Sequence, residues 1–387
     1  MNPAGAVIIE GHVQGLSNAR SLGEAGIPVI VVDRSNCIAR YSRYCKGFFY
    51  SPDFEGDDFA GFLADLAVRE GLQGWLLLPS NDHAVHTIAR NREDLGSIYR
   101  IITPALDVVD KIYDKKNLIQ IAESLGLPVP RTQYFRGVND RLSSGLKLPV
   151  ITKGRFGLSF YKVMRAKALV AYTEEELHGQ LEYIASGYDL EKTFTQELIP
   201  STGLTHTVSF TAFCIDGEIR GHWTGQKLRE HPLTFGTATL AESITCRECH
   251  DLSVPLLRKL NYSGICEIEY LKDSRDGRYK LIEINARTWL WVGLAKRCGI
   301  NYALMAYRYV NGQQLSFPEN YDTGIKWINY LTDTWFSIRA MVSGKLKPGK
   351  YFRAMKGKRI NAVFSWHDPL PSLALIFLSF YIARKRG

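Results

Sequence analysis

The first 33 residues carry the feature that most constrains the fold, a strand, a turn, a helix and a second strand in succession. Residues 6–10 (AVIIE) and 29–33 (VIVVD) are short apolar runs typical of buried strands, and 16–26 has helical periodicity. Parallel strands require a crossover of this kind, so the segment predicts a Rossmann-like βαβ unit. Gly11 and Gly15 do not complete the dinucleotide motif G-x-G-x-x-G, which leaves a helix N-terminus suited to some other anion.

A further helix and strand extend this unit into a domain. Residues 59–71 have the pattern of a helix, and 75–80 (WLLLPS) have that of a buried parallel strand. We therefore expect a doubly wound α/β domain over residues 1–105. Residues 80–82 (Ser-Asn-Asp) lie at the carboxyl end of the strand at 75–80, where ligand groups gather in such sheets, although they could equally cap the next helix.

The next part of the chain predicts a helix, a strand and a loop. Residues 107–130 read as one helix that ends near Pro128, and 148–154 read as a buried strand that carries Lys153. The ammonium of that lysine must either reach solvent or meet an opposite charge. Residues 154–163 (GRFGLSFYKV) have the composition of a mobile loop that leads into another strand and could cover phosphates.

From residue 191 onward, strands dominate. Two long strands flank Asp216-Gly217, a dipeptide typical of a tight hairpin turn, and a helix is expected near 251–260. Apolar and polar residues then alternate over 264–273 and again over 278–287, with turn residues between them. This predicts a second hairpin.

One face of the second hairpin is polar. Glu283, Asn285 and Arg287 occur at alternate positions, so their side chains share a face, and Glu267 and Glu269 share a face of the other arm. Such a face is either the solvated side of a sheet or a site that binds metal and phosphate. Glu and Asn supply the hard oxygen ligands that Mg²⁺ prefers, and Arg binds oxyanions.

Composition and cysteine content indicate the cellular compartment of the protein and the charge of its binding partners. The 387 residues suit two or three domains, and 48 Lys and Arg against 39 Asp and Glu give a net charge of +9, which favours anionic partners. The N-terminus lacks a secretory signal, and seven scattered cysteines agree with reduced thiols, so a cytoplasmic protein is expected. Cys246 and Cys249 precede His250 as in haem or zinc motifs, but two thiols near the start of a helix are the favoured interpretation.

The C-terminus combines apolar and basic residues. Residues 373–383 are mostly apolar and precede Arg384, Lys385 and Arg386. At about 1.5 Å per helical residue, the apolar run is too short to cross a hydrocarbon core of about 30 Å. Packing on the core is favoured, and an interfacial helix on the inner face of an anionic membrane is the alternative. A nucleic-acid partner is not favoured, because only 345–359 mixes basic and aromatic residues, and lipid head groups would suit it equally.

The order of these parts resembles the ATP-grasp superfamily, in particular its carboxylate–amine ligases, including enzymes like carbamoyl-phosphate synthase and D-aspartate ligase. The likeness covers residues 5–312 and is most specific over 264–287, where G-x-x-x-x-E-Y, a turn and L-I-E-I-N-A-R look like the superfamily's metal hairpin. The resemblance implies an α/β and α+β chain with the ATP-grasp fold, a Rossmann-like domain before it and an extension after it. It also implies that Glu269, Glu283 and Asn285 are the metal ligands.

The resemblance implies further nucleotide and catalytic residues. Lys115 is the superfamily's first lysine, chosen over Lys111 and Lys116 by its spacing from the G-x-P-x-P turn, and Lys153 is the second. The interdomain hinge would comprise Gln196, Glu197, Leu198 and Ile199, with backbone groups of the last two facing adenine. Lys227 and Arg229 would face phosphate and substrate, although Arg229 could equally be an ordinary surface residue, and Arg287 would stabilise the transferring phosphoryl group.

The resemblance divides the chain into four regions. They are a Rossmann-like domain (1–105), a small ATP-grasp subdomain with the phosphate loop (106–190), a C-terminal ATP-grasp subdomain with the metal hairpin (191–320) and a basic and apolar extension (321–387).

The expected activity is that of an ATP-dependent ligase with Mg (or Mn). A small-molecule carboxylate and an amine would be its substrates, joined through an acyl phosphate. The alternative is an ATP-binding regulator or membrane-associated protein that keeps the fold without the chemistry. The phosphate loop is poor in glycine compared with the superfamily, which leaves that alternative open.

Overall fold

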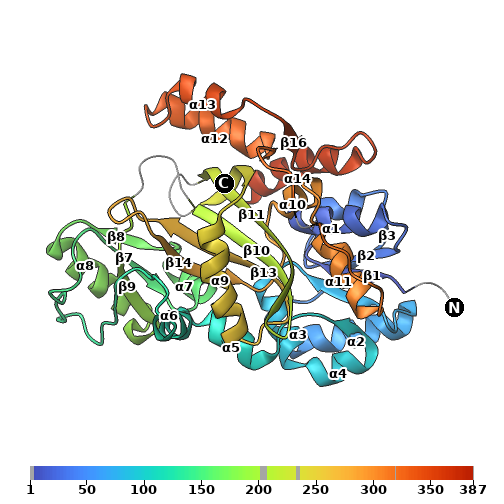
Figure 1. Ribbon diagram of the computed structural model, residues 1–387, viewed down its shortest axis with the longest axis horizontal. Coiled ribbons are helices and arrows are strands. Elements are labelled where there is room, and N and C mark those ends of the chain that lie inside the picture. The colour runs from blue at the N-terminus through green and yellow to red at the C-terminus, as the bar shows by residue number, and fades with distance from the viewer. Residues whose placement is uncertain (1–3, 201–206, 232–235, 319, 387) are drawn as a thin grey trace.

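The computed structural model describes residues 4–200, 207–231, 236–318 and 320–386. Within them the chain forms three β-sheets with helices packed around them (Figure 1). The first sheet is parallel with the order β3-β2-β1-β4-β5, as expected for a Rossmann-like domain. Its strands are β1 (Ala6–Ile9), β2 (Val29–Asp33), β3 (Cys45–Tyr50), β4 (Leu76–Pro79) and β5 (Arg100–Ile101).

Helices cover both faces of this sheet. Alternate residues of β1 point to opposite sides, so Ile8 packs with α1 in one core while Val7 packs with α2 in another. The helices of this part are α1 (Val13–Gly23), η1 (Ile38–Tyr41), α2 (Asp57–Glu70), α3 (Asp82–Arg90) and α4 (Arg92–Ile98).

The second sheet is antiparallel and has the order β6-β9-β7-β8. Its strands are β6 (Thr132–Gln133), β7 (Val150–Gly154), β8 (Leu169–Ala171) and β9 (Thr193–Glu197), and α8 (Glu174–Ala185) and η2 (Leu190–Lys192) accompany them. Strand β9 follows residue 190, where the sequence suggests a boundary, yet it pairs with β7 in this smaller sheet.

Two sequence-based expectations in this part were wrong. The segment 107–130 is not one helix, because Asp114 adopts an extended backbone between α5 (Leu106–Tyr113) and α6 (Lys115–Ser124) and caps α6 through its side chain. The segment expected to be a loop contains the helix α7 (Gly157–Met164). Phe160 and Met164, one turn apart, place an apolar face of α7 in the core of the second sheet.

The third sheet has seven strands in the order β14-β13-β10-β11-β12-β15-β16 and contains both predicted hairpins. Its strands are β10 (Thr207–Ile215), β11 (Glu218–His231), β12 (Thr237–Ile244), β13 (Gly264–Lys272), β14 (Tyr279–Asn285), β15 (Lys326–Ile328) and β16 (Arg359–Asn361). The accompanying helices are α9 (Arg247–Lys259), α10 (Val292–Arg297), α11 (Tyr302–Val310), α12 (Tyr330–Val342), α13 (Pro348–Ala354) and α14 (Leu370–Arg386). The C-terminal extension therefore lengthens this sheet by two short strands.

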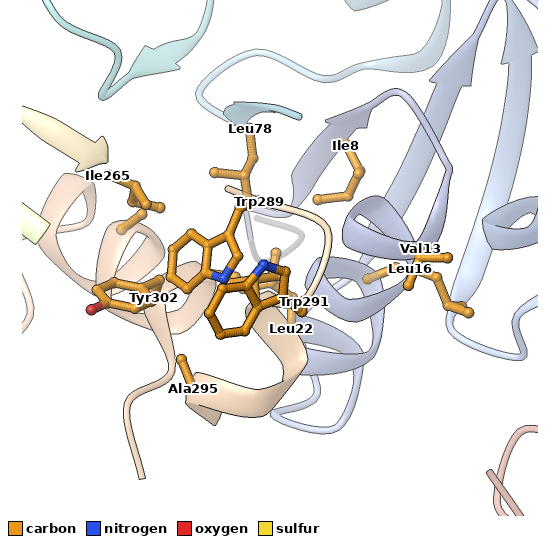
Figure 2. Close-up of a cluster of buried hydrophobic side chains, with 14 of the residues drawn as sticks. Ile8, Val13, Leu16, Leu22, Leu78, Ile265, Trp289, Trp291, Ala295 and Tyr302 are labelled. Atoms are coloured by element: carbon orange, nitrogen blue, oxygen red, sulfur yellow. The ribbon is translucent and has the colours of Figure 1, made fainter. Parts of the chain in front are cut away.

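A tryptophan-rich core joins the first sheet to the third. Trp289 and Trp291 are buried among side chains such as Ile8 and Leu16 of the Rossmann-like domain and Tyr302 of α11 (Figure 2). The two aromatic residues that follow the polar strand β14 are thus core residues. None of the helices in the described part of the chain has both the length and the apolar character needed to cross a membrane.

Candidate functional site

The polar face of the β13–β14 hairpin is assembled by strand register. Glu269 lies directly opposite Glu283, and Glu267 lies directly opposite Asn285. Directly opposed residues of an antiparallel pair point to the same face, with Cβ atoms about 5 Å apart. Three carboxylates and an amide therefore gather in a small area, as the alternation in the sequence predicts.

Lysines from two other elements meet these carboxylates. The Nζ atom of Lys227, on β11, lies 2.7 Å from Oε1 of Glu269, and Nζ of Lys115, at the start of α6, lies 3.4 Å from Oε2 of Glu283. Four of the predicted site residues are thereby brought together.

Lys153 of β7 belongs to the same electrostatic cluster. Burial lowers its pKa to about 8, against the opposing effect of the Glu283 charge. Burial disfavours the charged form of Glu283, but the charges of Lys115, Lys227 and Lys153 outweigh it and lower the pKa of this carboxyl to about 2. Glu283 is therefore an ionised carboxylate surrounded by cations, an arrangement that a polyphosphate with bound metal could enter.

Glu267 is a member of the cluster that the sequence-based prediction of ligands left out. Its carboxylate accepts hydrogen bonds from Oγ of Ser209 (2.8 Å) and from Nδ2 of Asn285 (3.1 Å). Burial and the nearby charge of Glu269 raise its pKa to about 8. Its position on the same face as Glu269 was the available signal.

Arg287 connects the hairpin to the Rossmann-like domain. Its guanidinium donates to both carboxylate oxygens of Asp82, at 2.8 and 3.0 Å, and Nη2 lies 3.5 Å from Oδ1 of Asn285. Asp82 follows β4, and the preceding Asn81 caps α3 while its Nδ2 donates to Glu10 (3.0 Å). The segment after β4 thus supplies both a helix cap and a partner for the site arginine.

The predicted hinge lies at the end of β9. The Glu197 carboxylate accepts from the backbone N–H of Arg131 (3.0 Å), from Nζ of Lys280 (3.0 Å) and from Nη2 of Arg275 (2.7 Å), so this side chain fixes local structure. Gln196 donates to Oγ1 of Thr132 in the neighbouring strand.

The backbone of the hinge is partly engaged as well. The N–H of Leu198 donates to the carbonyl of Pro149 at 3.0 Å. An adenine contact at Leu198 and Ile199 would therefore use backbone groups other than that N–H.

Arg229 has a different environment from Lys227. Its guanidinium forms two hydrogen bonds with Asp333 of α12, at 2.9 and 2.7 Å, and lies over the ring of Tyr351. Both charged side chains are buried, with Arg229 only 3% exposed. The described contacts of Arg229 thus hold α12 and α13 on the sheet.

The donor set fits Mg²⁺ held together with a nucleotide better than a metal held by protein alone. No three His, Cys, Asp or Glu side chains among the described residues are gathered closely enough to hold a metal ion by themselves. Mg²⁺ commonly takes one or two carboxylates, several waters and substrate phosphates. Glu269 and Glu283, with Asn285 beside them, match that chemistry.

Cys246 and Cys249 lie at the start of α9, as expected. Their sulfur atoms are 3.3 Å apart, and both thiols are free.

Comparisons with known proteins are consistent with this architecture. A family model described as the ATP-binding domain of the carbamoyl-phosphate synthase L chain matches residues 236–317, which include the whole β13–β14 hairpin. The D-aspartate ligase of Enterococcus faecium (strain Aus0004) is 26% identical over 226 residues, which are 55% of this chain and 53% of the ligase. The chain thus spans about half the length of that relative.

Two solved structures share the fold. The N5-carboxyaminoimidazole synthetase of Staphylococcus aureus has a TM-score of 0.66 at 15% identity, covering 88% of this chain and 86% of that one. The biotin carboxylase domain of 2-oxoglutarate carboxylase from Hydrogenobacter thermophilus, in complex with MgADP, ADP and bicarbonate, has a TM-score of 0.64 at 15% identity, covering 83% and 73%.

Proposed function

Because the chain has the ATP-grasp fold, we propose that it is an ATP- and Mg²⁺-dependent ligase that joins a carboxylate to an amine. The resemblance recognised in the sequence is confirmed, and it supports the proposal at the level of fold. The similarity to a D-aspartate ligase and to an N5-carboxyaminoimidazole synthetase supports the same reaction class.

One observation carries the proposal, the meeting of Glu269 and Glu283 with three lysines from separate elements. ATP brings about four negative charges, and phosphoryl transfer needs cations placed around them. Lys115, Lys153 and Lys227 supply three positive charges around the carboxylates. Convergence of lysines from three separate elements on one hairpin face suits a phosphate site, which needs several cations around the negative charge.

The residues take the following roles. Lys115 and Lys153 bind the nucleotide phosphates, Lys227 lies between the phosphates and the second substrate, and backbone groups of Leu198 and Ile199 other than the Leu198 N–H hold the adenine edge. Glu269, Glu283 and Asn285 would hold Mg²⁺, which when bound would neutralise charge on the phosphates. Asp82 holds the planar guanidinium of Arg287 beside Asn285, where it can stabilise an oxyanion.

The chemistry has two steps. A carboxylate oxygen of the first substrate attacks the γ-phosphorus of ATP, and the bond to ADP breaks, which gives an acyl phosphate. The nitrogen of the amine then attacks the acyl carbon, phosphate leaves with the bonding electron pair, and the nitrogen loses its proton. Arg287 stabilises negative charge on oxygen in both steps.

The test is release of ADP and phosphate from ATP when pooled small carboxylates and amines are added. We expect stimulation by at least one pool, and at least a hundredfold lower turnover in Glu283→Gln with unchanged circular dichroism. Glu218→Gln, an exposed glutamate on β11 paired with Arg258, is the matched control and should keep full activity. ATP binding with no turnover in any pool would instead favour a non-catalytic regulator.

We further propose that the protein acts in the cytoplasm, where ATP and reduced thiols coexist, and that its C-terminal helix touches the inner face of an anionic membrane. Helix α14 leaves Leu373, Ile376 and Phe377 exposed, while Ala374 is buried against the molecule. Replacing Leu373 and Phe377 together by Gln should lower flotation with anionic vesicles. Flotation that does not change would contradict a role for α14.

A further inference from the structure

Helix α12 exposes an apolar stripe that is unusual for a water-facing helix. Leu331, Trp335, Ile338 and Val342 follow one another at intervals of four, three and four residues and therefore lie on one face. Their side chains are 42, 61, 51 and 85% exposed, and Phe352 of α13 is 66% exposed. These five residues and the basic residues around them are called the α12–α13 surface below.

The exposed charges of this region have one sign. Between residues 330 and 370 the sequence contains only two acids, Asp333 and Asp368. Both are buried, Asp333 against Arg229 and Asp368 against Arg20. The exposed basic residues of the same region are Arg339, Lys345, Lys347, Lys350, Arg353, Lys356, Lys358 and Arg359.

The surface is anchored firmly to the body of the molecule. Asp333 accepts hydrogen bonds from Arg229 of β11 and from Thr239 of β12 (2.8 Å), and Arg229 also lies over the ring of Tyr351 in α13. Figure 1 shows α12 and α13 at the upper edge of the molecule, far from the Rossmann-like sheet. The apolar stripe is therefore presented on a fixed support.

An occupant of this surface must offer both negative charge and an apolar phase. A second copy of the same surface would bring like charges together, which is unfavourable. A nucleic acid would neutralise the lysines but give Leu331, Ile338 and Val342 no apolar contact. A bilayer with anionic head groups offers both, because basic residues bind the head groups while Trp and aliphatic side chains enter the interface.

We propose that the α12–α13 surface docks on an anionic phospholipid bilayer. The inference is independent of the ligase activity and of α14, because it rests on different residues. A protein that works on water-soluble substrates would thereby be concentrated at the membrane surface.

The test is flotation of the full-length protein with vesicles of phosphatidylcholine alone or with 30% phosphatidylglycerol. We expect binding to the anionic vesicles only, with roughly a tenfold or larger loss of the partition coefficient in Lys345→Glu/Lys350→Glu. Trp335→Gln/Val342→Gln keeps the charge of the wild type but loses apolar contact with the bilayer. We therefore expect its partition coefficient to fall by a similar factor even at low salt.

Two variants serve as controls. Val68→Gln removes an exposed apolar side chain from α2, and Lys259→Glu reverses an exposed charge on α9; both should bind as the wild type does. Equal binding to neutral vesicles, or wild-type binding by both double variants of the surface, would overturn the proposal. So would concentration-dependent dimerisation without lipid that Trp335→Gln/Val342→Gln abolishes, or tighter binding to homopolymer RNA than to anionic vesicles.

Discussion

At the β13–β14 hairpin, each of two opposed glutamates is paired with a lysine. Glu269 faces Glu283 across the hairpin, and each carboxylate has its own lysine, Lys227 or Lys115. Two carboxylates this close repel each other, and the lysines offset that repulsion. Exchange of these lysine contacts for Mg²⁺ and phosphates would keep the charges balanced, which makes the cluster suited to bind the nucleotide and the metal together.

Alternation along β14 was enough to predict that Glu283 and Asn285 share a face. The lysines could not be found in that way, because Lys115, Lys153 and Lys227 are far apart in the sequence and only the resemblance to a family selected them. Arg229 remains a predicted site residue, but motif reasoning did not reveal its contacts. It follows Lys227 by two positions, and its partner Asp333 lies in a helix beyond the common fold.

We predict that Arg229→Met mainly reduces stability. The substitution leaves Asp333 as a buried carboxylate without its partner, a loss that costs about 3 kcal/mol or more. Urea unfolding should show this fall in the free energy of unfolding, whereas Arg220→Met, an exposed arginine on the same strand, should change it little. Wild-type stability together with lost turnover would instead indicate a catalytic role for Arg229.

Glu10 is expected to make the stability of the protein depend on pH. This residue follows β1 with a φ of 71°, and burial raises its pKa from 4.5 to about 7, partly opposed by the hydrogen bond from Asn81. The folded state therefore binds the proton more tightly than the unfolded state does. The stability that this carboxyl contributes is greatest below about pH 4.5 and falls as the pH rises through 7.

Glu10→Gln should remove that part of the pH dependence. Denaturant unfolding between pH 4.5 and 8 would show a shallower decline for Glu10→Gln than for the wild type, while exposed Glu218→Gln would follow the wild type. Parallel curves for Glu10→Gln and the wild type would mean that Glu10 is ionised throughout this range.

Among the elements, the longer apolar strands and the two hairpins were predictable from the sequence, whereas α7, the break between α5 and α6 and the shortest strands were not. Apolar runs located β1, β2, β4 and β7, the Asp216-Gly217 turn located the first hairpin, and alternation located the second. The break at Asp114 depends on a contact that no local pattern reveals, because the Asp114 carboxylate caps α6 and also pairs with Arg155 just beyond β7. Gly154 lies shortly before α7 and Gly157 is its first residue, and both glycines favoured the prediction of a loop. The helix is explained by the packing of Phe160 and Met164 in the core, which the local sequence does not show.

The contribution of the Asp114 cap to stability can be tested by substitution at Asp114. Asp114→Asn keeps a side-chain acceptor for the N–H of Lys116, whereas Asp114→Ala removes it, so the alanine variant should be less stable by about 1 kcal/mol. Thermal or urea unfolding of the two variants measures the difference. Both variants lose the charge pair with Arg155, so that contribution largely cancels in the comparison, and equal stabilities would show that the cap contributes nothing.

At the scale of the whole molecule, three sheets supply different parts of one site. The third sheet supplies the carboxylates and Lys227, the second supplies Lys153, and the segment after β4 of the first supplies Asp82 for Arg287. Family resemblance predicted that the second and third sheets contribute to one site, but it did not predict the pairing of Asp82 with Arg287. It gave no indication that β15 and β16 would continue the third sheet, because strands of three residues are too short to show periodicity.

Calorimetric titration of ATP, with and without Mg²⁺, into the wild type, Glu283→Gln and Glu218→Gln would measure directly whether the β13–β14 face binds MgATP. If the β13–β14 face is a MgATP site, Mg²⁺ alone should show no saturable binding, ATP should bind markedly more tightly with Mg²⁺ than without, and only Glu283→Gln should lose that enhancement. Equal affinity for ATP with and without Mg²⁺, or an undiminished enhancement in Glu283→Gln, would contradict the account.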